Sequence, residues 1–275
     1  MSTPSQNIFN QTEADRPEYK NHKIFEKIKS VVSFYDSFSN SIMHFSTVGT
    51  TSVINIDSYL YSSIQGTLES IQLLLENGKI GDAFCLLRKY HDSIILNVYI
   101  NLYIEKNKNT ENLYIKEVQD WLSGKNRLPH DDYRKMSEYI KKSDQLKNIY
   151  SVLQEDKSYI ETRQRCNDHT HYNSFENVLI NDNRVYYTGR NELLNTFQND
   201  LENLFILHFS CIFYLNDHYM VSSDHLDAIE MGMMPEPSSQ YWVAPFIQDI
   251  FSNLVSVRRS DIAKMIKENT KMELL

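Results

Sequence analysis

The chain has 275 residues, of which 41% are hydrophobic and 23% charged, and its formal net charge is -8 at pH 7. This charge argues against a protein that coats nucleic acid by bulk electrostatics, although it leaves room for a local basic cleft. Strand-and-turn architectures need turn residues at short intervals, and the chain has only seven glycines and six prolines. The composition therefore predicts an all-α fold, a multi-helix bundle with a helical insertion.

The cysteines and the hydropathy of the chain indicate the cellular compartment. Cys85, Cys166 and Cys211 have no paired spacing, and no secretory signal precedes them, which favours reduced thiols in a cytoplasmic protein. The most apolar run, residues 204–215, is interrupted by His208 and Ser210 and is too short to span a bilayer. We therefore expect no membrane partner. A lone histidine on an apolar face, such as His208, is usually a hydrogen-bonded core residue.

Apolar residues at helical spacing predict the main helices of the bundle. Residues 1–21 are polar and predict a disordered tail, followed by a single helical domain over 22–275. Asp57 is the expected N-cap of the second helix, and Asn77-Gly78 its stop. The third helix is apolar around most of its circumference, which predicts a central position in the bundle. The four stripes cover residues 22–44, 57–76, 79–105 and 190–215.

The segments around these stripes are less regular. Residues 46–56 have no clear period and predict a link. Residues 106–156 are rich in lysine, asparagine and glutamate and predict an insertion with short helices near 112–123, 131–142 and 144–154, joined by links at 107–112 and 124–130. Beyond the ambiguous segment 175–180 we expect a loop at 181–189. The C-terminal part, 216–275, predicts a helix from Ser222 or Ser223 to Gly232, one over 238–257 begun or bent at Pro245, and one over 261–269 capped by Ser260.

The stretch Arg163–Asn173, RQRCNDHTHYN, concentrates the polar chemistry of the chain. Cleavage of RNA without a metal requires a base for the 2′-hydroxyl, an acid for the departing 5′-oxygen and a cation for the phosphorane. Histidine suits the proton transfers because it titrates near neutrality, and arginine suits the charge because it grips two phosphate oxygens. The stretch therefore predicts phosphate chemistry.

The spacing of Arg165 and His171 limits how they can act together. Six residues of regular helix separate the two side chains by about 120° around the axis. Convergence on one phosphate then requires Arg165 in a loop or a bent first turn, or a long reach around the helix. Arg163 and His169 have the same spacing and form an alternative register.

An arginine followed after four to six residues by a histidine, here in RCNDHTH, resembles the motif of the HEPN domains (higher eukaryotes and prokaryotes nucleotide-binding). That family consists of helical bundles, many of them metal-independent ribonucleases of toxin–antitoxin and abortive-infection systems. The resemblance covers about residues 57–215 and leaves out the insertion and the C-terminal helices. Cys166 departs from the polar residue that usually follows the arginine.

The resemblance implies roles for particular residues. Arg165 and His171 would be catalytic and Asn167 supporting, with Arg163 and His169 as the other register. Further residues would support the site, namely Asp168, and also Arg88 and Asp92 from AFCLLRKYHDS. The resemblance also implies an RNA substrate, no cofactor and a homodimer, because paired motifs meet across a dimer interface in that family. An antitoxin or another protein partner fits the same systems.

Three other interpretations use the same residues. In the first, the stretch is a buried polar network in a non-catalytic sensor, antitoxin-associated or scaffold protein, with His171, Tyr172 and Asn173 capping helices. In the second, a metal hydrolase, a Zn, Mn or Fe ion is bound, although HExxH and paired Glu-x-x-His motifs are absent. Its ligands would be His169, His171 and Asp168, joined by His91 and Asp92 or by Asp217, His218, Asp224 and His225.

The third interpretation is a nucleophilic Cys166 activated by His169. Arg88 and Asp92 also have a purely structural explanation, a salt bridge one helical turn apart at the edge of the core.

Overall fold

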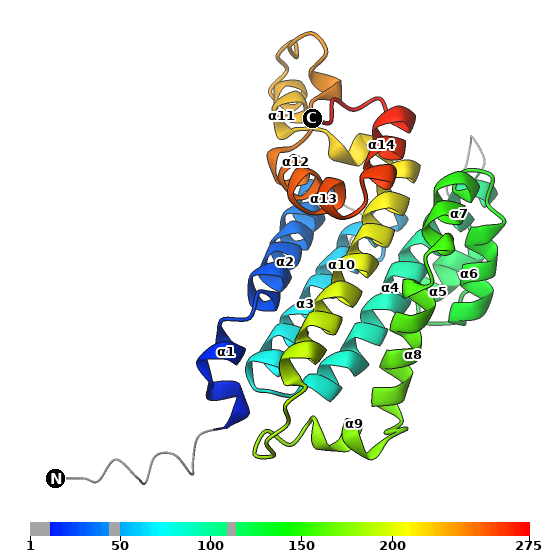
Figure 1. Ribbon diagram of the computed structural model, residues 1–275. Coiled ribbons are helices and arrows are strands. Elements are labelled where there is room, and N and C mark those ends of the chain that lie inside the picture. The colour runs from blue at the N-terminus through cyan, green and yellow to red at the C-terminus, as the bar shows by residue number, and fades with distance from the viewer. Residues whose placement is uncertain (1–11, 44–49, 109–113) are drawn as a thin grey trace. The chain divides into compact units, whose positions relative to one another are not determined.

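The computed structural model describes residues 12–43, 50–108 and 114–275, and this part of the chain consists of helices joined by loops and turns (Figure 1). Its residues form no strand, apart from an isolated antiparallel bridge between Val221 and Val243. The all-α prediction is confirmed. The expected tail up to residue 11 and parts of the expected links at 46–56 and 107–112 lie outside the described residues. No described helix is both long and apolar enough to cross a membrane.

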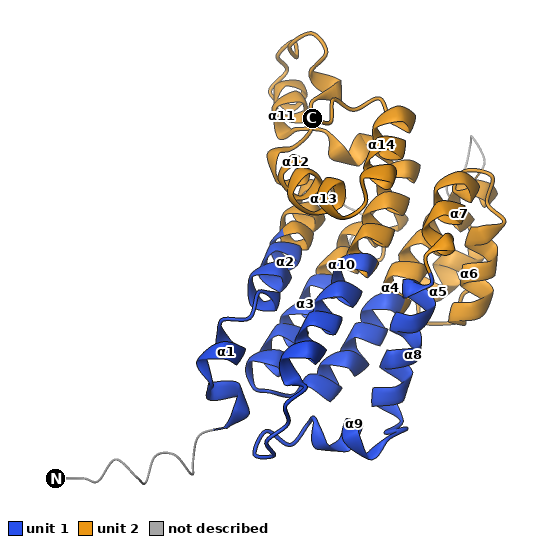
Figure 2. Cartoon of the chain, in the orientation of Figure 1, with its two compact units in different colours: residues 1–33, 64–91, 157–203 blue, residues 34–63, 92–156, 204–275 orange. Residues whose placement is uncertain are grey.

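The chain divides into two compact units, each built from three separate segments (Figure 2). Unit 1 comprises residues 1–33, 64–91 and 157–203, and unit 2 comprises residues 34–63, 92–156 and 204–275. The expected insertion, residues 106–156, belongs to unit 2. Four long helices contribute residues to both units: α2 (Ile24–Ser41), α3 (Ile56–Glu76), α4 (Ile80–Asn107) and α10 (Arg190–Leu215).

Unit 1 begins with two short helical turns, η3 (Glu13–Asp15) and α1 (Pro17–Lys20). We expected these residues in a disordered tail, but Tyr19 is only 3% exposed and its hydroxyl donates to the carbonyl of Leu75 over 2.6 Å. The amide of Ala14 also donates to Oδ1 of Asn183. An aromatic side chain that buries its ring and finds an acceptor for its hydroxyl accounts for the order. The same unit contains α8 (Ser158–Thr170) and α9 (Phe175–Leu179).

The turn between α3 and α4 ends α3 as the Asn77-Gly78 pair predicts. Gly78 adopts a left-handed φ of 72°, and the amides of Gly78 and Lys79 donate to the carbonyls of Leu75 and Leu74. These two bonds satisfy two of the last four carbonyls of the helix, and the left-handed conformation of the residue after Asn77 favours glycine.

Unit 2 has an aromatic core. Phe34 meets Phe205 edge-on at 5.1 Å between ring centroids, and Phe38 stacks on Tyr61 at 4.7 Å. His208, at 0% exposure, lies within this core, with Nδ1 2.7 Å from the Tyr35 hydroxyl. Burial lowers the pKa of His208 to about 3, so the ring is neutral. His208 is thus a hydrogen-bonded core histidine.

Asp57 does not cap α3. The helix begins one residue earlier, after η4 (Val53–Asn55), and the carboxylate of Asp57 turns into unit 2. There its Oδ1 accepts from the side-chain amides of Asn97 and Asn101, and its Oδ2 accepts from the hydroxyl of Tyr219. Burial raises the pKa of Asp57, and the three donors oppose that shift. Asn97 Oδ1 also lies 2.9 Å from Nε2 of His208, so one chain of hydrogen bonds joins the aspartate to the core histidine.

The remaining helices of unit 2 lie in the insertion and the C-terminal part. Asp132 caps α6 by accepting from the amide of Lys135. Pro245 begins a helix, so the expected helix over 238–257 starts later than predicted. Ser260 is the first residue of the last helix rather than its cap, a position that Arg259 takes. The bounds are α5 Lys116–Leu122, α6 Tyr133–Lys141, α7 Lys147–Glu155, η5 Asp217–Met220, α11 Ser223–Glu230, η6 Ser239–Tyr241, α12 Pro245–Ile250, a π-helical turn Phe251–Val255, α13 Ser256–Arg258 and α14 Ser260–Asn269.

Candidate functional site

Most of the Arg163–Asn173 stretch lies inside helix α8 of unit 1. The helix buries one face through Tyr159, Thr162, Cys166 and His169, which recur at the spacing of three and four residues that places side chains on one side of a helix. The structure therefore places Arg165 in the middle of a helix, away from any loop or first turn. The helix is regular up to Thr170, and His171 is its C-cap. Arg165 and His171 therefore keep the expected angular separation of about 120° around the helix axis.

Arg165 forms an ion pair with Asp200 of α10. Its Nε donates to Oδ2 over 2.8 Å, and Nη2 donates to Oδ1 of the same carboxylate. The hydroxyl of Thr162 donates to that Oδ1 over 2.7 Å. Asp200 is 1% exposed and Thr162 is fully buried, whereas the side chain of Arg165 is 33% exposed. The carboxylate thus receives three hydrogen bonds from α8. Its hydrogen bonds with the guanidinium raise the pKa of Arg165 above the ordinary value.

His171 lies at the end of α8 and is exposed. It is the C-cap residue, and its amide donates to the carbonyl of Asn167 over 3.0 Å. Tyr172 follows in the left-handed region at φ 48°, and the amide of Asn173 returns to the carbonyl of Asp168. These bonds form the usual C-terminal closure of a helix, with tyrosine where glycine is favoured.

Asp168 holds this end of the helix together. Its Oδ1 accepts from the side-chain amide of Gln164 over 2.9 Å and from the side-chain amide of Asn173 over 2.8 Å. Its backbone carbonyl accepts from the side chain of Asn177 in α9. The polar residues of the stretch are therefore largely engaged with one another and with neighbouring backbone.

The structure does not bring the two proposed catalytic residues together. Within the described residues, no hydrogen bond or ion pair joins Arg165 to His171. Arg165 is ion-paired with Asp200 of α10, while His171 lies at the exposed C-terminal end of α8. The only other carboxylate paired with Arg165 in the described chain is that of Glu161, 3.9 Å away and exposed.

The second register, Arg163 and His169, is more deeply packed. His169 is 6% exposed and its ring stacks on Phe84, with 4.3 Å between centroids and 1° between planes. Burial lowers the pKa of His169. Burial also lowers the pKa of His91 to about 3, and the charge of Arg163 contributes to that shift. A stacked, buried imidazole is poorly placed to reach a nucleic acid.

Cys166 and Asn167 lie between the arginine and the histidine. Burial raises the pKa of the Cys166 thiol to about 12, which keeps it protonated and unsuited to the role of a nucleophile. Oδ1 of Asn167 is buried and has no hydrogen-bond partner among the described residues.

The residues proposed as metal ligands do not converge. No group of three or more His, Cys, Asp or Glu side chains in the described chain is arranged to hold a metal ion. In the second ligand set, His225 lies 2.8 Å from the hydroxyl of Ser239, and Asp217 accepts from the amide of Lys271.

Arg88 and Asp92 fall in different units. Arg88 is half-buried on the part of α4 that belongs to unit 1. Asp92, in unit 2, lines a cavity of about 550 Å³ together with residues of α5, α6 and the link between them. The structure thus associates Asp92 with the insertion, and sequence reasoning had no signal for that cavity beyond the polar residue on an apolar helix.

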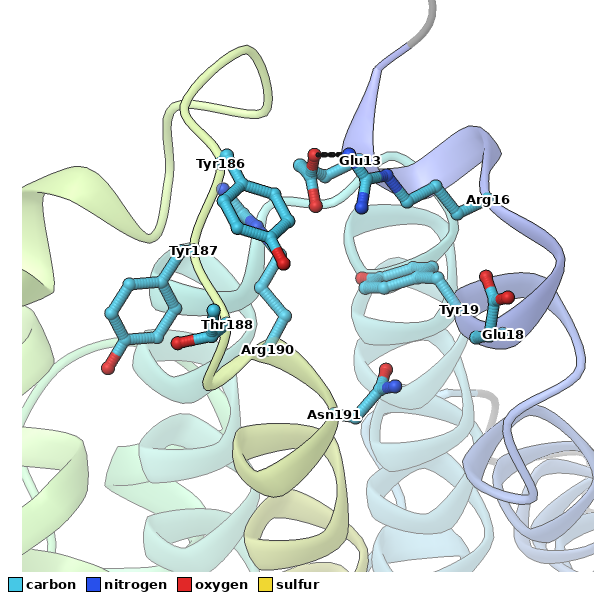
Figure 3. Close-up of a pocket in the computed structure, with 9 residues that line it drawn as sticks. All are labelled: Glu13, Arg16, Glu18, Tyr19, Tyr186, Tyr187, Thr188, Arg190 and Asn191. Atoms are coloured by element: carbon cyan, nitrogen blue, oxygen red, sulfur yellow. Dashed lines mark ion pairs between the residues drawn. The ribbon is translucent and has the colours of Figure 1, made fainter.

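A smaller cavity of about 160 Å³ lies in unit 1 (Figure 3). Arg16 is ion-paired with Glu13 at one edge and lies over the ring of Tyr186. Arg190, at 3% exposure, lines the same cavity, but its guanidinium donates to the backbone carbonyls of residues 180, 182 and 185. Arg190 therefore fastens the loop 180–185 to the start of α10.

Comparison with known proteins found no relative. No family model matches the chain, and no curated protein or solved structure matches it.

Proposed function

We propose that this chain is a non-catalytic helical binding or scaffold protein, in which Arg163–Asn173 is a structural polar network. The observation that carries the proposal is the ion pair of Arg165 with the buried Asp200. A desolvated carboxylate that accepts from Nε and Nη2 of a guanidinium competes directly with a phosphate for these two donors. Arg165 therefore serves to hold α8 on α10.

The other end of the stretch supports the same proposal. Three hydrogen bonds close the C-terminal end of α8 locally. The backbone amides of His171 and Asn173 donate to the carbonyls of Asn167 and Asp168, and the side-chain amide of Asn173 donates to the Asp168 carboxylate. Each satisfies backbone or side-chain groups that would otherwise be left open at a helix terminus. A partner protein, an antitoxin included, is the expected ligand of such a scaffold.

A second candidate is the metal-independent endoribonuclease of a toxin or abortive-infection system. It is favoured by the exposure of His171 and by the left-handed backbone of Tyr172 beside it, because strained residues cluster at functional sites. In this proposal RNA is the substrate, the residues act in a homodimer, and Arg165 exchanges Asp200 for a phosphate.

Cleavage of labelled RNA in EDTA separates the two candidates. Wild type, Arg165→Ala and His171→Ala are compared at equal concentration, with urea unfolding of each variant as the control for folding. The scaffold proposal predicts no cleavage by any of the three proteins and a loss of stability for Arg165→Ala alone. Cleavage by the wild type that leaves cyclic phosphate ends, and that is lost in a folded His171→Ala, would replace it by the ribonuclease.

A further inference from the structure

Exposed apolar side chains gather on α11 and the turn that follows it, both in unit 2 (Figure 2). A single exposed apolar residue is ordinary on a protein surface, whereas a cluster of them is typical of an interaction surface. We call this cluster the methionine surface. Its members are Leu226 (41% exposed), Ile229 (54%), Met231 (73%), Met233 (56%) and Met234 (95%).

Local hydrogen bonds hold the backbone of the methionine surface. Gly232 adopts a left-handed φ of 67°, and the amides of Gly232 and Met233 donate to carbonyls of the last turn of α11 over 3.0 Å and 2.8 Å. This pair of bonds is the usual closure of a helix by a left-handed glycine. Earlier in the helix, Nδ1 of His225 lies 2.8 Å from the hydroxyl of Ser239, which is buried. The exposed side chains therefore project from a fixed backbone.

Carboxylates border the methionine surface. Glu230 is four residues after Leu226 and three after Asp227, so the helix places the Glu230 side chain beside both. Four exposed carboxylates lie on this segment, namely those of Asp224, Asp227, Glu230 and Glu236. None of the four is ion-paired within the described part of the chain, and the sequence has no lysine or arginine from residue 191 to residue 257. The surface is thus both apolar and negatively charged.

This charge disfavours several classes of partner. Nucleic acid and anionic lipid headgroups are repelled by carboxylates. A second copy that docked through the same surface would bring carboxylates against carboxylates. The segments of this chain outside the described residues, 1–11, 44–49 and 109–113, contain neither lysine nor arginine, so they do not supply the opposite charge. A complementary partner has apolar side chains bordered by cations.

We propose that the methionine surface binds a basic amphipathic helix of a partner protein. Such a helix has an apolar stripe bordered by lysine and arginine, which matches an apolar cluster bordered by carboxylates. Methionine side chains are unbranched and flexible, so they pack against apolar residues of different shapes. This inference rests on the proposed function of a binding or scaffold protein and adds the chemistry of its partner.

The test uses the full chain and a synthetic peptide of leucine and lysine, about 14 residues long, with leucine at helical spacing. Two control peptides accompany it. One has the same residues in an order without helical periodicity, and the other has glutamate in place of lysine. Affinity is measured by fluorescence anisotropy of the labelled peptides, and the place of binding is found by NMR of the protein with methyl-labelled methionine.

The nine methionines of the chain make the NMR measurement internally controlled. We expect the leucine–lysine peptide to shift the methyl signals of Met231, Met233 and Met234. The signals of Met136 and Met220 should stay in place, because these side chains are 8% and 0% exposed. They also report that each variant is folded. Both control peptides should bind at least about tenfold more weakly, since each lacks either the apolar stripe or the complementary charge.

A pair of apolar variants tests the contribution of the methionines. Replacing both Met233→Ser and Met234→Ser should weaken the peptide roughly tenfold or more, because the apolar area that these side chains bury on binding is lost. Val257→Ser is the matched control. Val257 is an apolar residue of α13 with 74% exposure, and its replacement should leave the affinity unchanged.

A pair of charge variants tests the contribution of the carboxylates. Asp227→Asn combined with Glu230→Gln should weaken the peptide several-fold and make its affinity less dependent on salt, because exposed charges are screened by ions. Glu138→Gln combined with Asp144→Asn is the matched control. It changes the net charge by the same amount at two exposed carboxylates of the insertion, and it should leave the salt dependence unchanged.

Several outcomes would overturn the proposal. They are the absence of binding by the leucine–lysine peptide, equal binding of the peptide without periodicity, and equal affinity of wild type and the double methionine variant. A dimer that the double methionine variant loses would make a second copy the occupant, and binding to anionic vesicles through the same methyl groups would make it a lipid surface.

Failure of this inference is distinguishable from failure of the proposed function. The peptide measurement concerns α11 in unit 2, whereas RNA cleavage and the stability of Arg165→Ala concern α8 in unit 1. RNA cleavage that depends on His171 would overturn the scaffold proposal. Absence of peptide binding without RNA cleavage would remove this surface alone.

Discussion

Arg165 donates from two guanidinium nitrogens to the carboxylate of Asp200, 35 residues further along the chain. This contact joins two helices of unit 1 through a carboxylate that is 1% exposed. A buried charge without a partner is costly, so the ion pair makes each residue depend on the other. The stretch with the most reactive side chains in the sequence is thus, at its centre, a helix–helix contact.

Thr162 is the third member of this contact, and its hydroxyl is expected to contribute to stability. Thr162→Val keeps the shape and removes the donor to Asp200, which should lower the free energy of unfolding by about 1.5–3 kcal/mol, the range for hydrogen bonds to charged groups. Thr196→Val is the matched control, because that hydroxyl bonds the Glu192 carbonyl within its own helix, and it should cost under about 0.5 kcal/mol. Urea unfolding measures both, and equal losses would contradict the prediction.

Tyr172 occupies a left-handed position that favours glycine. Tyr172→Gly should raise the free energy of unfolding by about 0.5–1 kcal/mol, because the relief of left-handed strain exceeds the added entropy of the unfolded chain. Tyr172→Ala keeps the strain and removes the ring, which is 51% exposed, and serves as the control. If glycine and alanine have the same effect in thermal unfolding, the backbone is not strained there.

Replacing Gly78 and Gly66 by alanine should change the free energy of unfolding in opposite directions. At Gly78, φ is 72° and a Cβ would lie 2.5 Å from Oδ1 of Asn183, so Gly78→Ala should cost about 1–2 kcal/mol or more. Gly66 is inside α3 with nothing within 4 Å of its Cβ position, so Gly66→Ala should stabilise by about 0.5–1 kcal/mol. Denaturant midpoints of the two variants give the signs directly, and a shared sign would refute the assignment of the turn.

His208 should make the protein sensitive to acid. Its folded pKa is about 3, against an ordinary value of 6.5. Between these pH values the unfolded chain binds a proton that the folded chain does not, so stability falls as pH falls, by about 1.4 kcal/mol per pH unit. The contribution is complete above pH 6.5. His91 has the same direction of shift.

His208→Gln isolates this contribution. The variant loses part of the bonding to Tyr35 and Asn97, so it should be less stable than the wild type at pH 8. Because it lacks the titrating ring, the gap should narrow as the pH falls from 6.5 towards 4. The measurement is the free energy of unfolding of both proteins at each pH, and a constant gap would show that His208 does not titrate on unfolding.

Much of the bundle could be predicted because its long helices carry aliphatic stripes. The predicted helix over 190–215 has the bounds of α10, and the predicted stop at Asn77-Gly78 ends α3. The helix α8 was missed as a helix because its buried face is made of Tyr159, Thr162, Cys166 and His169, none of them aliphatic. These four residues recur at helical spacing, but a search for aliphatic residues at that spacing does not detect them.

The candidate site was harder to predict because its contacts are long-range. Nothing near Arg165 in the sequence indicates that Asp200 is its partner. Similarly, Asp57 has the local features of a helix cap, yet Asn97, Asn101 and Tyr219 together offer its carboxylate more donors. Local spacing predicts which residues share a helix face, whereas partners on other helices depend on how the helices pack.

A double-mutant cycle between Arg165→Ala and Asp200→Ala is the most direct measurement of the central claim, that this arginine is structural. Urea unfolding of the four proteins should give a coupling free energy of about 1–3 kcal/mol. The matching cycle with Glu161→Ala, whose carboxylate is exposed and 3.9 Å from Arg165, should give under about 0.5 kcal/mol. A coupling near zero between Arg165 and Asp200 would contradict the account, because the guanidinium would then be available to a phosphate.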